Sequence, residues 1–113
     1  YSQEGGREKE KWIERAGIRV NEEFNEVNVR GEPKELSNIE YSILLLMMRH
    51  PGKIFSAANI YESVWNEPYY YTCSNTVMVH IRKLRAKIEE DPQNPVHIQT
   101  VWGKGYKFEA GNK

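Results

Sequence analysis

Cysteine is nearly absent from the sequence, and so are the apolar segments that would mark a membrane or secreted protein. The lone Cys73 cannot form an internal disulfide, and no cluster of cysteines and histidines surrounds it to build a zinc site. The longest apolar run, Ile43 to Met48, is far too short to cross a bilayer, and the first residues lack the apolar stretch of a secretory signal. We therefore expect a cytoplasmic protein with no membrane contact, no metal and no cofactor.

Neither sign of charge is in excess, since 16 Lys and Arg residues balance 16 Asp and Glu residues. Neutrality counts against a nucleic-acid partner, because a basic domain is the usual electrostatic footprint of one. The distribution favours the opposite interpretation. The stretch from Pro68 to Ile88 contains no Asp or Glu, and the acids lie mostly in the first forty residues, with Glu40 the last of these. We expect these acids to face away from a polyanion. The basic residues of the acid-free stretch are His80, Arg82, Lys83, Arg85 and Lys87.

The chain length of 113 residues suits one domain with one modest core. Residues 1–15 are rich in glycine and charge and predict a linker or tail, so we expect the folded domain over residues 16–110. Three short β segments, at residues 18–20, 26–29 and 34–36, predict a small antiparallel sheet at the start of that domain.

Three helices and a hairpin are predicted after the sheet. Ser37 and Glu40 form a capping box at the start of a first helix, and Ser56 caps a second over about residues 57–65. A third helix is predicted over about residues 74–89.

The C-terminal segment predicts two strands, residues 96–102 and 106–108, joined by a Gly-Lys-Gly turn in which glycine permits positive φ. The order of these elements predicts an α+β fold of the winged helix-turn-helix type. In such a fold this β-hairpin, over residues 98–108, is the wing.

The third helix carries the residues that are best suited to contact a partner. At about 100° per residue, Val77, Ile81, Leu84 and Ile88 fall in one narrow stripe, which predicts the core face. The opposite face is basic, short-chained and free of acids. Its members are Asn75, Thr76, Val79, Arg82, Lys83 and Ala86, with His80 and Lys87 on one flank and Arg85 on the other. A solvated face usually mixes both signs of charge, so this pattern favours a helix that enters the major groove of DNA.

Each residue type on that face suits a different DNA atom. Arg82 and Lys83 can donate to guanine, and Val79 can pack on a thymine methyl group, so these three carry the predicted base contacts. The predicted phosphate contacts from this helix are Asn75, Thr76, His80, Arg85 and Lys87. Lys104 lies between two glycines at the turn of the hairpin. It suits an approach to phosphates or to a minor groove, although it is alternatively a solubilising turn residue.

Four stretches of the sequence resemble the C-terminal effector domains of OmpR/PhoB-type bacterial response regulators. They are LSNIEYSILLLMMRHPGKIFS, the VW pair at Val64 and Trp65, NTVMVHIRKLRAKI and IQTVWGKGYKF. The resemblance extends from about Ile18 to Phe108. The Asn-Thr pair that begins the third of these stretches, and the TVWG sequence of the wing, look like the VanR-type branch. It implies a winged helix with an N-terminal four-stranded sheet, acting as a transcription factor in a two-component phosphorelay.

The same resemblance implies further contacts and partners. Trp65, Thr100, Gly103 and Tyr106 occupy positions that touch the DNA backbone. The loop that follows the second helix corresponds to a turn that contacts RNA polymerase in family members, and a packed or simply exposed loop is the alternative. Its candidate residues are Asn66, Glu67, Tyr69, Tyr70 and Tyr71. Double-stranded DNA is expected to be bound at direct repeats, head to tail. A receiver domain, which 113 residues cannot also contain, and a cognate histidine kinase are the implied signalling partners.

The sequence departs from the family pattern at three positions. Family members commonly have arginine, aspartate and arginine where this chain has Asn75, Met78 and Trp102, so the base preference and the wing contacts do not carry over. Four aromatic residues are predicted to pack in the core or on the sheet, in preference to stacking on bases. They are Trp65, Trp102, Tyr106 and Phe108.

Two other function classes stand beside DNA binding. A winged-helix module can use the same helix to bind a protein, and that interpretation stays open. An enzyme is not expected, because His80 has no nucleophile or carboxylate beside it in the sequence and no catalytic motif occurs elsewhere.

Overall fold

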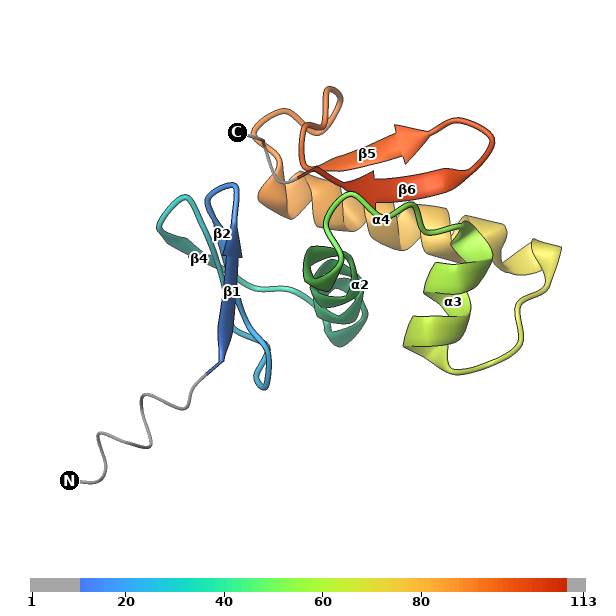
Figure 1. The fold of residues 1–113 in the computed structure, drawn as a ribbon, viewed down its shortest axis with the longest axis horizontal. Helices are drawn as coiled ribbons and strands as arrows, with labels where there is room; N and C mark the ends of the chain where they lie inside the picture. Colours follow the sequence, from blue (N-terminus) through green and yellow to red (C-terminus); the bar gives the residue numbers. More distant parts are fainter. Residues whose placement is uncertain (1–10, 110–113) are drawn as a thin grey trace.

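In the computed structural model, which describes residues 11–109, a four-stranded antiparallel sheet is followed by three α-helices and a two-stranded hairpin (Figure 1). The sheet order follows the sequence and contains β1 (Trp12–Arg15), β2 (Ile18–Asn21), β3 (Val27–Val29) and β4 (Glu32–Lys34). The antiparallel sheet at the start of the domain was predicted, and its presence is confirmed.

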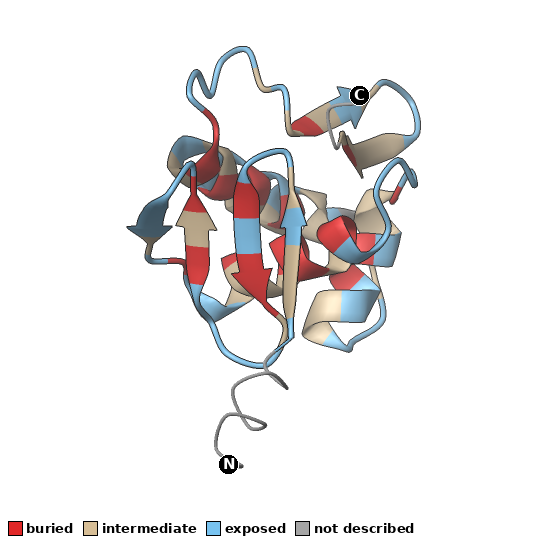
Figure 2. Ribbon diagram, turned by 60° about the vertical axis from the view of Figure 1, so that its left-hand side comes forward, coloured by how far each residue is buried: buried red, intermediate tan, exposed pale blue. Residues whose placement is uncertain are grey.

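One face of the sheet is apolar because its side chains alternate. Val20 pairs with Val27 and Ile18 pairs with Val29, and all four side chains are at most 2% exposed. Figure 2 shows buried and exposed residues alternating along β2. The pairing places this valine- and isoleucine-rich face against the helices, which is why the register cannot slip by one residue.

Two details of the sheet differ from the prediction. Trp12–Arg15 form the edge strand β1, although they were expected to belong to a linker over residues 1–15. This strand exists through its ladder with β2, which begins with Trp12 opposite Asn21, and a ladder leaves only a weak signal in four residues of sequence. The last strand is Glu32–Lys34 rather than residues 34–36. Residues 1–10 and 110 lie outside the described residues.

The three helices begin and end close to the predicted residues. They are α2 (Asn38–Arg49), α3 (Ala57–Trp65) and α4 (Ser74–Ile88), and a short 3₁₀ turn, η1 (Tyr71–Cys73), precedes α4. The predicted capping box is present, since Ser37 Oγ accepts from the Glu40 N–H at 3.1 Å and Glu40 Oε1 accepts from the Ser37 N–H at 3.0 Å. Local capping chemistry therefore fixes where α2 starts.

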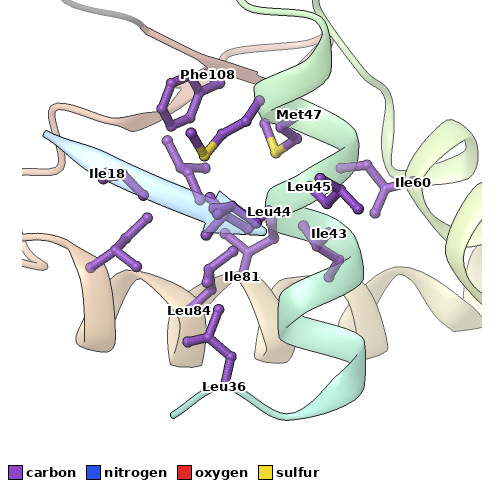
Figure 3. Close-up of a cluster of buried hydrophobic side chains, with 14 of the residues drawn as sticks. Ile18, Leu36, Ile43, Leu44, Leu45, Met47, Ile60, Ile81, Leu84 and Phe108 are labelled. Carbon is purple, nitrogen blue, oxygen red and sulfur yellow. The ribbon is translucent and has the colours of Figure 1, made fainter. Parts of the chain in front are cut away.

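Helix α2 is the centre of the hydrophobic core. Figure 3 shows Ile18 of β2, Ile60 of α3, Ile81 of α4 and a phenylalanine from the hairpin converging on it. Ile43 and its neighbours on α2 are fully buried, so the helix is apolar on most of its surface. Sheet, helices and hairpin consequently share one core.

The hairpin, which we call the wing, consists of β5 (Ile98–Val101) and β6 (Gly105–Phe108), and it lies over α4 (Figure 1). The segment between α2 and α3 pairs with it through two backbone hydrogen bonds. The Phe55 N–H donates to the Tyr106 carbonyl at 2.7 Å, and the Tyr106 N–H donates to the Phe55 carbonyl at 2.8 Å. Gly105 adopts a φ of +143° beside this bridge, and a Cβ at that position would overlap the Phe55 carbonyl.

The closeness of Gly105 to Phe55 predicts a large effect of one added methyl group. Gly105→Ala should lower the free energy of unfolding by on the order of 3 kcal/mol, because both φ and the Phe55 backbone oppose a side chain. Gly103→Ala is the matched control. That glycine also has a positive φ, +79°, but open space around it, so about 1 kcal/mol is expected. Urea unfolding of both variants measures the difference, and equal losses would contradict the close approach.

Candidate nucleic-acid interface

Helix α4 lies with its predicted apolar stripe inward. Val77, Ile81, Leu84 and Ile88 are each at most 1% exposed. The predicted core face of this helix is therefore confirmed. Because a helix is rigid, burying this stripe forces the opposite residues outward. The exposed residues of α4 are Asn75, Met78, Val79, Arg82, Lys83 and Ala86.

The three residues predicted to read bases lie together on that outer face. Val79 is 38% exposed, and both Arg82 and Lys83 are exposed. Neither cation forms a hydrogen bond or a salt bridge with any part of residues 11–109. Their donors are consequently available to a partner without first breaking an internal contact.

His80 and Trp65 meet between α3 and α4. The two rings are edge to face with centroids 5.3 Å apart, and Trp65 in turn stacks on Tyr61 at 4.8 Å. His80 Nδ1 donates to the Thr76 carbonyl at 2.8 Å, which leaves Nε2 for an external group. His80, Trp65 and Thr76 are all half-buried, whereas Asn75 is exposed.

Arg85 differs from the expectation that it is free for phosphate. Its Nε and Nη2 donate to the Ile98 carbonyl at 3.0 and 2.8 Å, and Nη2 also reaches Thr100 Oγ1 at 3.0 Å. The guanidinium carbon lies 5.8 Å from the Tyr106 ring centroid. The structure therefore uses this cation to join α4 to β5, because Ile98 lies beside it in space although 13 residues away in sequence.

Lys87, which was predicted to contact phosphate, also has a partner within the fold. Its ammonium donates to Glu40 Oε1 at 2.6 Å, and Glu40 is 3% exposed. Glu40 was expected to face away from a polyanion, and it contacts α4 through Lys87 and not through the exposed residues of that helix. Burial by itself raises the pKa of Glu40, but the hydrogen bonds from Lys87 and from the Ser37 N–H outweigh it and hold the pKa below its ordinary value. The pair fastens α2 to α4.

The wing presents its turn to solvent. Thr100, Gly103 and Lys104 are exposed, and Tyr106 is half-buried. Trp102 is 89% exposed, so its predicted scaffold role is wrong. It follows Val101, the last residue of β5, where the strand has left the core. Phe108, at the other end of the wing, is fully buried as predicted.

A groove separates α4 from the wing. Its volume is about 550 Å³, and its walls include Arg82 and Arg85 from the helix and Thr100, Trp102 and Tyr106 from the wing. No acidic residue lines it. Residues 74–88 and 98–108, which form α4 and the wing on either side of this groove, contain no Asp or Glu, so this surface can receive an elongated polyanion.

The loop after α3 is held partly by side chains of α3 itself. Asn66 ends α3 with a φ of +61°, Glu67 accepts a hydrogen bond from Tyr61 at 3.4 Å, and the Tyr69 N–H donates to Glu62 at 3.1 Å. Tyr70 is 64% exposed. The Tyr71 side chain lies outside what the structure describes.

Membrane spans and metal sites are two other features to consider in residues 11–109. No helix among them is long and apolar enough to cross a bilayer. In the same part of the chain, no group of three or more His, Cys, Asp or Glu residues could hold a metal ion.

One buried charged residue beside this surface was not predicted from the sequence. Glu89 is 5% exposed, and its carboxylate accepts hydrogen bonds from the backbone N–H groups of Val96, His97 and Ile98. A glutamate at the end of a helix is common and carries no signal of burial, so only the fold reveals this contact.

The family model described as "Transcriptional regulatory protein, C terminal" matches residues 31–108. A transcriptional regulatory protein of Bacillus subtilis, YrkP, is 56% identical over 108 residues, which are 96% of this chain and 47% of YrkP. The regulatory protein VanR of Enterococcus faecium is 34% identical over 97 residues, 86% of this chain and 42% of VanR. The chain thus spans less than half the length of these relatives.

Two solved structures share the architecture. The RstA DNA-binding domain of Klebsiella pneumoniae, solved in complex with the RstA box, has a TM-score of 0.80 at 26% identity and covers 88% of this chain and 98% of that one. The Thermotoga maritima response regulator DrrB, an OmpR/PhoB homologue, has a TM-score of 0.78 at 29% identity over 92% of this chain and 46% of its own.

These matches, together with the three helices and the wing, define a winged-helix domain of the OmpR/PhoB type. The chain belongs to the family of C-terminal domains of transcriptional regulatory proteins. The predicted fold class and the predicted resemblance are both confirmed.

The charge on Glu40 should stabilise the fold in a pH-dependent way. Glu40→Gln keeps the capping box but loses the ion pair with Lys87, and it should lower the free energy of unfolding by roughly 1 kcal/mol at neutral pH, since Lys87 is partly solvated. A lowered pKa means that the contribution is present above the ordinary carboxyl pKa and is lost as the pH falls through the folded value. The gap between the two proteins should therefore shrink on acidification.

Urea unfolding across a pH series measures this gap. Glu22→Gln is the control, because Glu22 pairs with the largely exposed Arg49 at 3.3 Å and should contribute little. A Glu40→Gln penalty that stays constant down to acidic pH would rule out the ion pair as its source.

Proposed function

We propose that this chain is the effector domain of a two-component response regulator and binds double-stranded DNA sequence-specifically to control transcription. The observation that carries the proposal is the outer face of α4, where Arg82 and Lys83 are exposed and unpaired with residues 11–109 and the neighbouring surface is free of acids. A helix with this combination of long donors and short side chains fits the major groove. The RstA domain, solved with its DNA box, supports the proposal through its similar fold.

The roles on this surface divide by reach. Lys83 and Arg82 donate to guanine edges, and Val79 contacts a thymine methyl group, so these residues select sequence. Phosphate contacts come from residues that flank the outer face of α4 and from the wing, and they fix the register of the helix. They are Trp65, Asn75, Thr76, His80, Thr100, Gly103, Lys104 and Tyr106. Lys87 does not join this set, because Glu40 already holds its ammonium.

Several finer features belong to the same proposal. The family model describes a C-terminal region, which supports an N-terminal receiver domain and a cognate histidine kinase as signalling partners. Binding to direct repeats, head to tail, and a cytoplasmic location complete the role of a response regulator. The loop from Asn66, with Glu67, Tyr69 and the exposed Tyr70, is the surface offered to RNA polymerase.

Salt dependence and base preference test the proposal together. The affinity of the chain for a duplex selected from a random pool should fall steeply with salt, since each neutralised phosphate releases counterions. Lys83→Ala should cost on the order of 1–3 kcal/mol on the selected sequence and relax its preference at one position. Lys104→Ala should weaken every duplex about equally and reduce the log–log salt slope by about 0.9.

Fluorescence anisotropy over a salt series measures the affinity and the salt slope, and its repetition with substituted duplexes measures the base preference. Lys87→Ala is the matched control. Lys87 is on the same helix with the same charge but is paired with Glu40, so its removal should leave the salt slope unchanged. A salt-insensitive affinity, or a protein partner that competes for the α4 face, would favour a protein-interaction module instead.

The exposed Trp102 should contribute an uncharged contact at the wing tip. Trp102→Ala should weaken binding by roughly 1–3 kcal/mol through loss of ring contact with sugars or bases, while leaving the salt slope unaltered. The adjacent Lys104→Ala, which does alter the slope, separates the two kinds of contact in one hairpin. Unchanged affinity for the Trp102 variant would show that the wing tip does not touch the duplex through this ring.

A further inference from the structure

Two oppositely charged residues, Arg85 of α4 and Glu89 at its C-cap, hold the backbone N–H and carbonyl of one residue of the wing. Arg85 and Glu89 are four residues apart and therefore lie on one side of the helix. Arg85 Nε and Nη2 donate to the Ile98 carbonyl at 3.0 and 2.8 Å, while Glu89 Oε2 accepts from the Ile98 N–H at 2.9 Å. Ile98 is thus held at its donor and at its acceptor by the helix that reads the groove.

The contacts continue on both sides of Ile98. Glu89 also accepts from the Val96 N–H at 2.9 Å and from the His97 N–H at 3.0 and 3.2 Å. Arg85 Nη2 reaches forward to Thr100 Oγ1 at 3.0 Å. These hydrogen bonds are charge-assisted. Glu89 is only 5% exposed, and in such a buried environment hydrogen bonds are strong and directional. We call Arg85, Glu89 and the backbone of residues 96–98 the helix–wing clamp.

The clamp is attached at the start of β5. The Ile98 side chain is fully buried and pairs with Phe108 across the hairpin, so the first residue of the wing is fixed by its side chain as well as by its backbone N–H and carbonyl. Four residues later the chain reaches the exposed Trp102 and then Lys104. The wing is therefore anchored at its base and exposed at its tip.

From this arrangement we infer that Arg85 and Glu89 are positioning residues, which set the spacing between the outer face of α4 and the wing tip so that both engage one duplex at once. The inference rests on the proposed DNA binding. Two contacts on a rigid body reinforce each other, because once the first has formed the second is held at a high effective concentration. A wing free to swing would lose ordering entropy on binding and contribute less.

This role differs from a direct contact in a way that can be measured. A positioning residue acts through the wing, so its loss and the loss of a wing contact should not add. Glu89 is not one of the residues proposed to contact DNA. Glu89→Gln is close to isosteric, and it removes the charge that holds three backbone N–H groups.

The test is a pair of double-mutant cycles in DNA affinity, with the whole chain and the duplex that it selects from a random pool. Glu89→Gln should weaken binding by roughly 3- to 30-fold. In that background Lys104→Ala should cost much less than it costs in the unmodified chain, while Lys83→Ala should cost the same factor in both. Equal Lys104→Ala losses in the two backgrounds would overturn the inference.

A second variant keeps the test decisive if Glu89→Gln does not fold. Arg85→Lys retains the charge but cannot form the forked contact with Ile98 and Thr100. If Arg85 positions the wing, Lys104→Ala should likewise cost much less in this variant than in the unmodified chain. If Arg85 instead acts as a phosphate ligand, Arg85→Lys should keep its salt slope and its additivity with Lys104→Ala, and the inference fails.

Failure of the proposed function has a different signature. An unmodified chain that binds no duplex at low salt contradicts DNA binding itself. An unmodified chain that binds, with additive cycles, contradicts only the clamp. Hydrogen exchange of the amides of residues 96–98 in each variant confirms that the local contacts were changed while the rest of the fold stayed protected.

Discussion

The direction of the exposed face of α4 depends on one constraint, which is the burial of the apolar stripe of this helix against the core. Val77, Ile81, Leu84 and Ile88 are all essentially inaccessible to solvent, and each aliphatic side chain buried in this way contributes about 1.5–3 kcal/mol. No comparable energy acts on the opposite face. The core therefore sets the rotation of the helix, and Arg82 and Lys83 point outward because the stripe points inward. A polar face on a helix packed less firmly would have no fixed direction.

The overall neutrality of the chain is compatible with a basic surface because key acids are used inside the fold. Glu40 caps α2 and pairs with Lys87, and Glu89 is satisfied by backbone N–H groups of the wing. A buried carboxylate with its own donors projects little field to the far side of the helix. Net charge summed over a sequence is consequently a poor guide to the local potential that a polyanion meets.

The features that could be predicted from the sequence are the local ones. Capping boxes and helical periodicity operate within a few residues, so the ends of α2 and α3 and the core stripe of α4 were predicted correctly. Contacts between distant residues were not. Lys87 and Glu40 are 47 residues apart, and Arg85 meets Ile98 only because β5 lies over α4. Trp102 was misjudged for the same reason: tryptophan is usually packed, but this one comes just after the strand has left the core.

The geometry of the wing explains why polar side chains of α4, rather than packing alone, hold its base. A strand advances about 3.3 Å per residue, so Trp102 lies roughly 13 Å along the chain from Ile98. A rotation of about ten degrees at Ile98 would move the tip by about 2 Å, which is larger than the tolerance of a hydrogen bond. Apolar contacts are non-directional and permit such a rotation, whereas a residue held at both its backbone N–H and its carbonyl does not. Directional bonds at the base, together with the bridge between Phe55 and Tyr106, thus determine where the exposed tip can be.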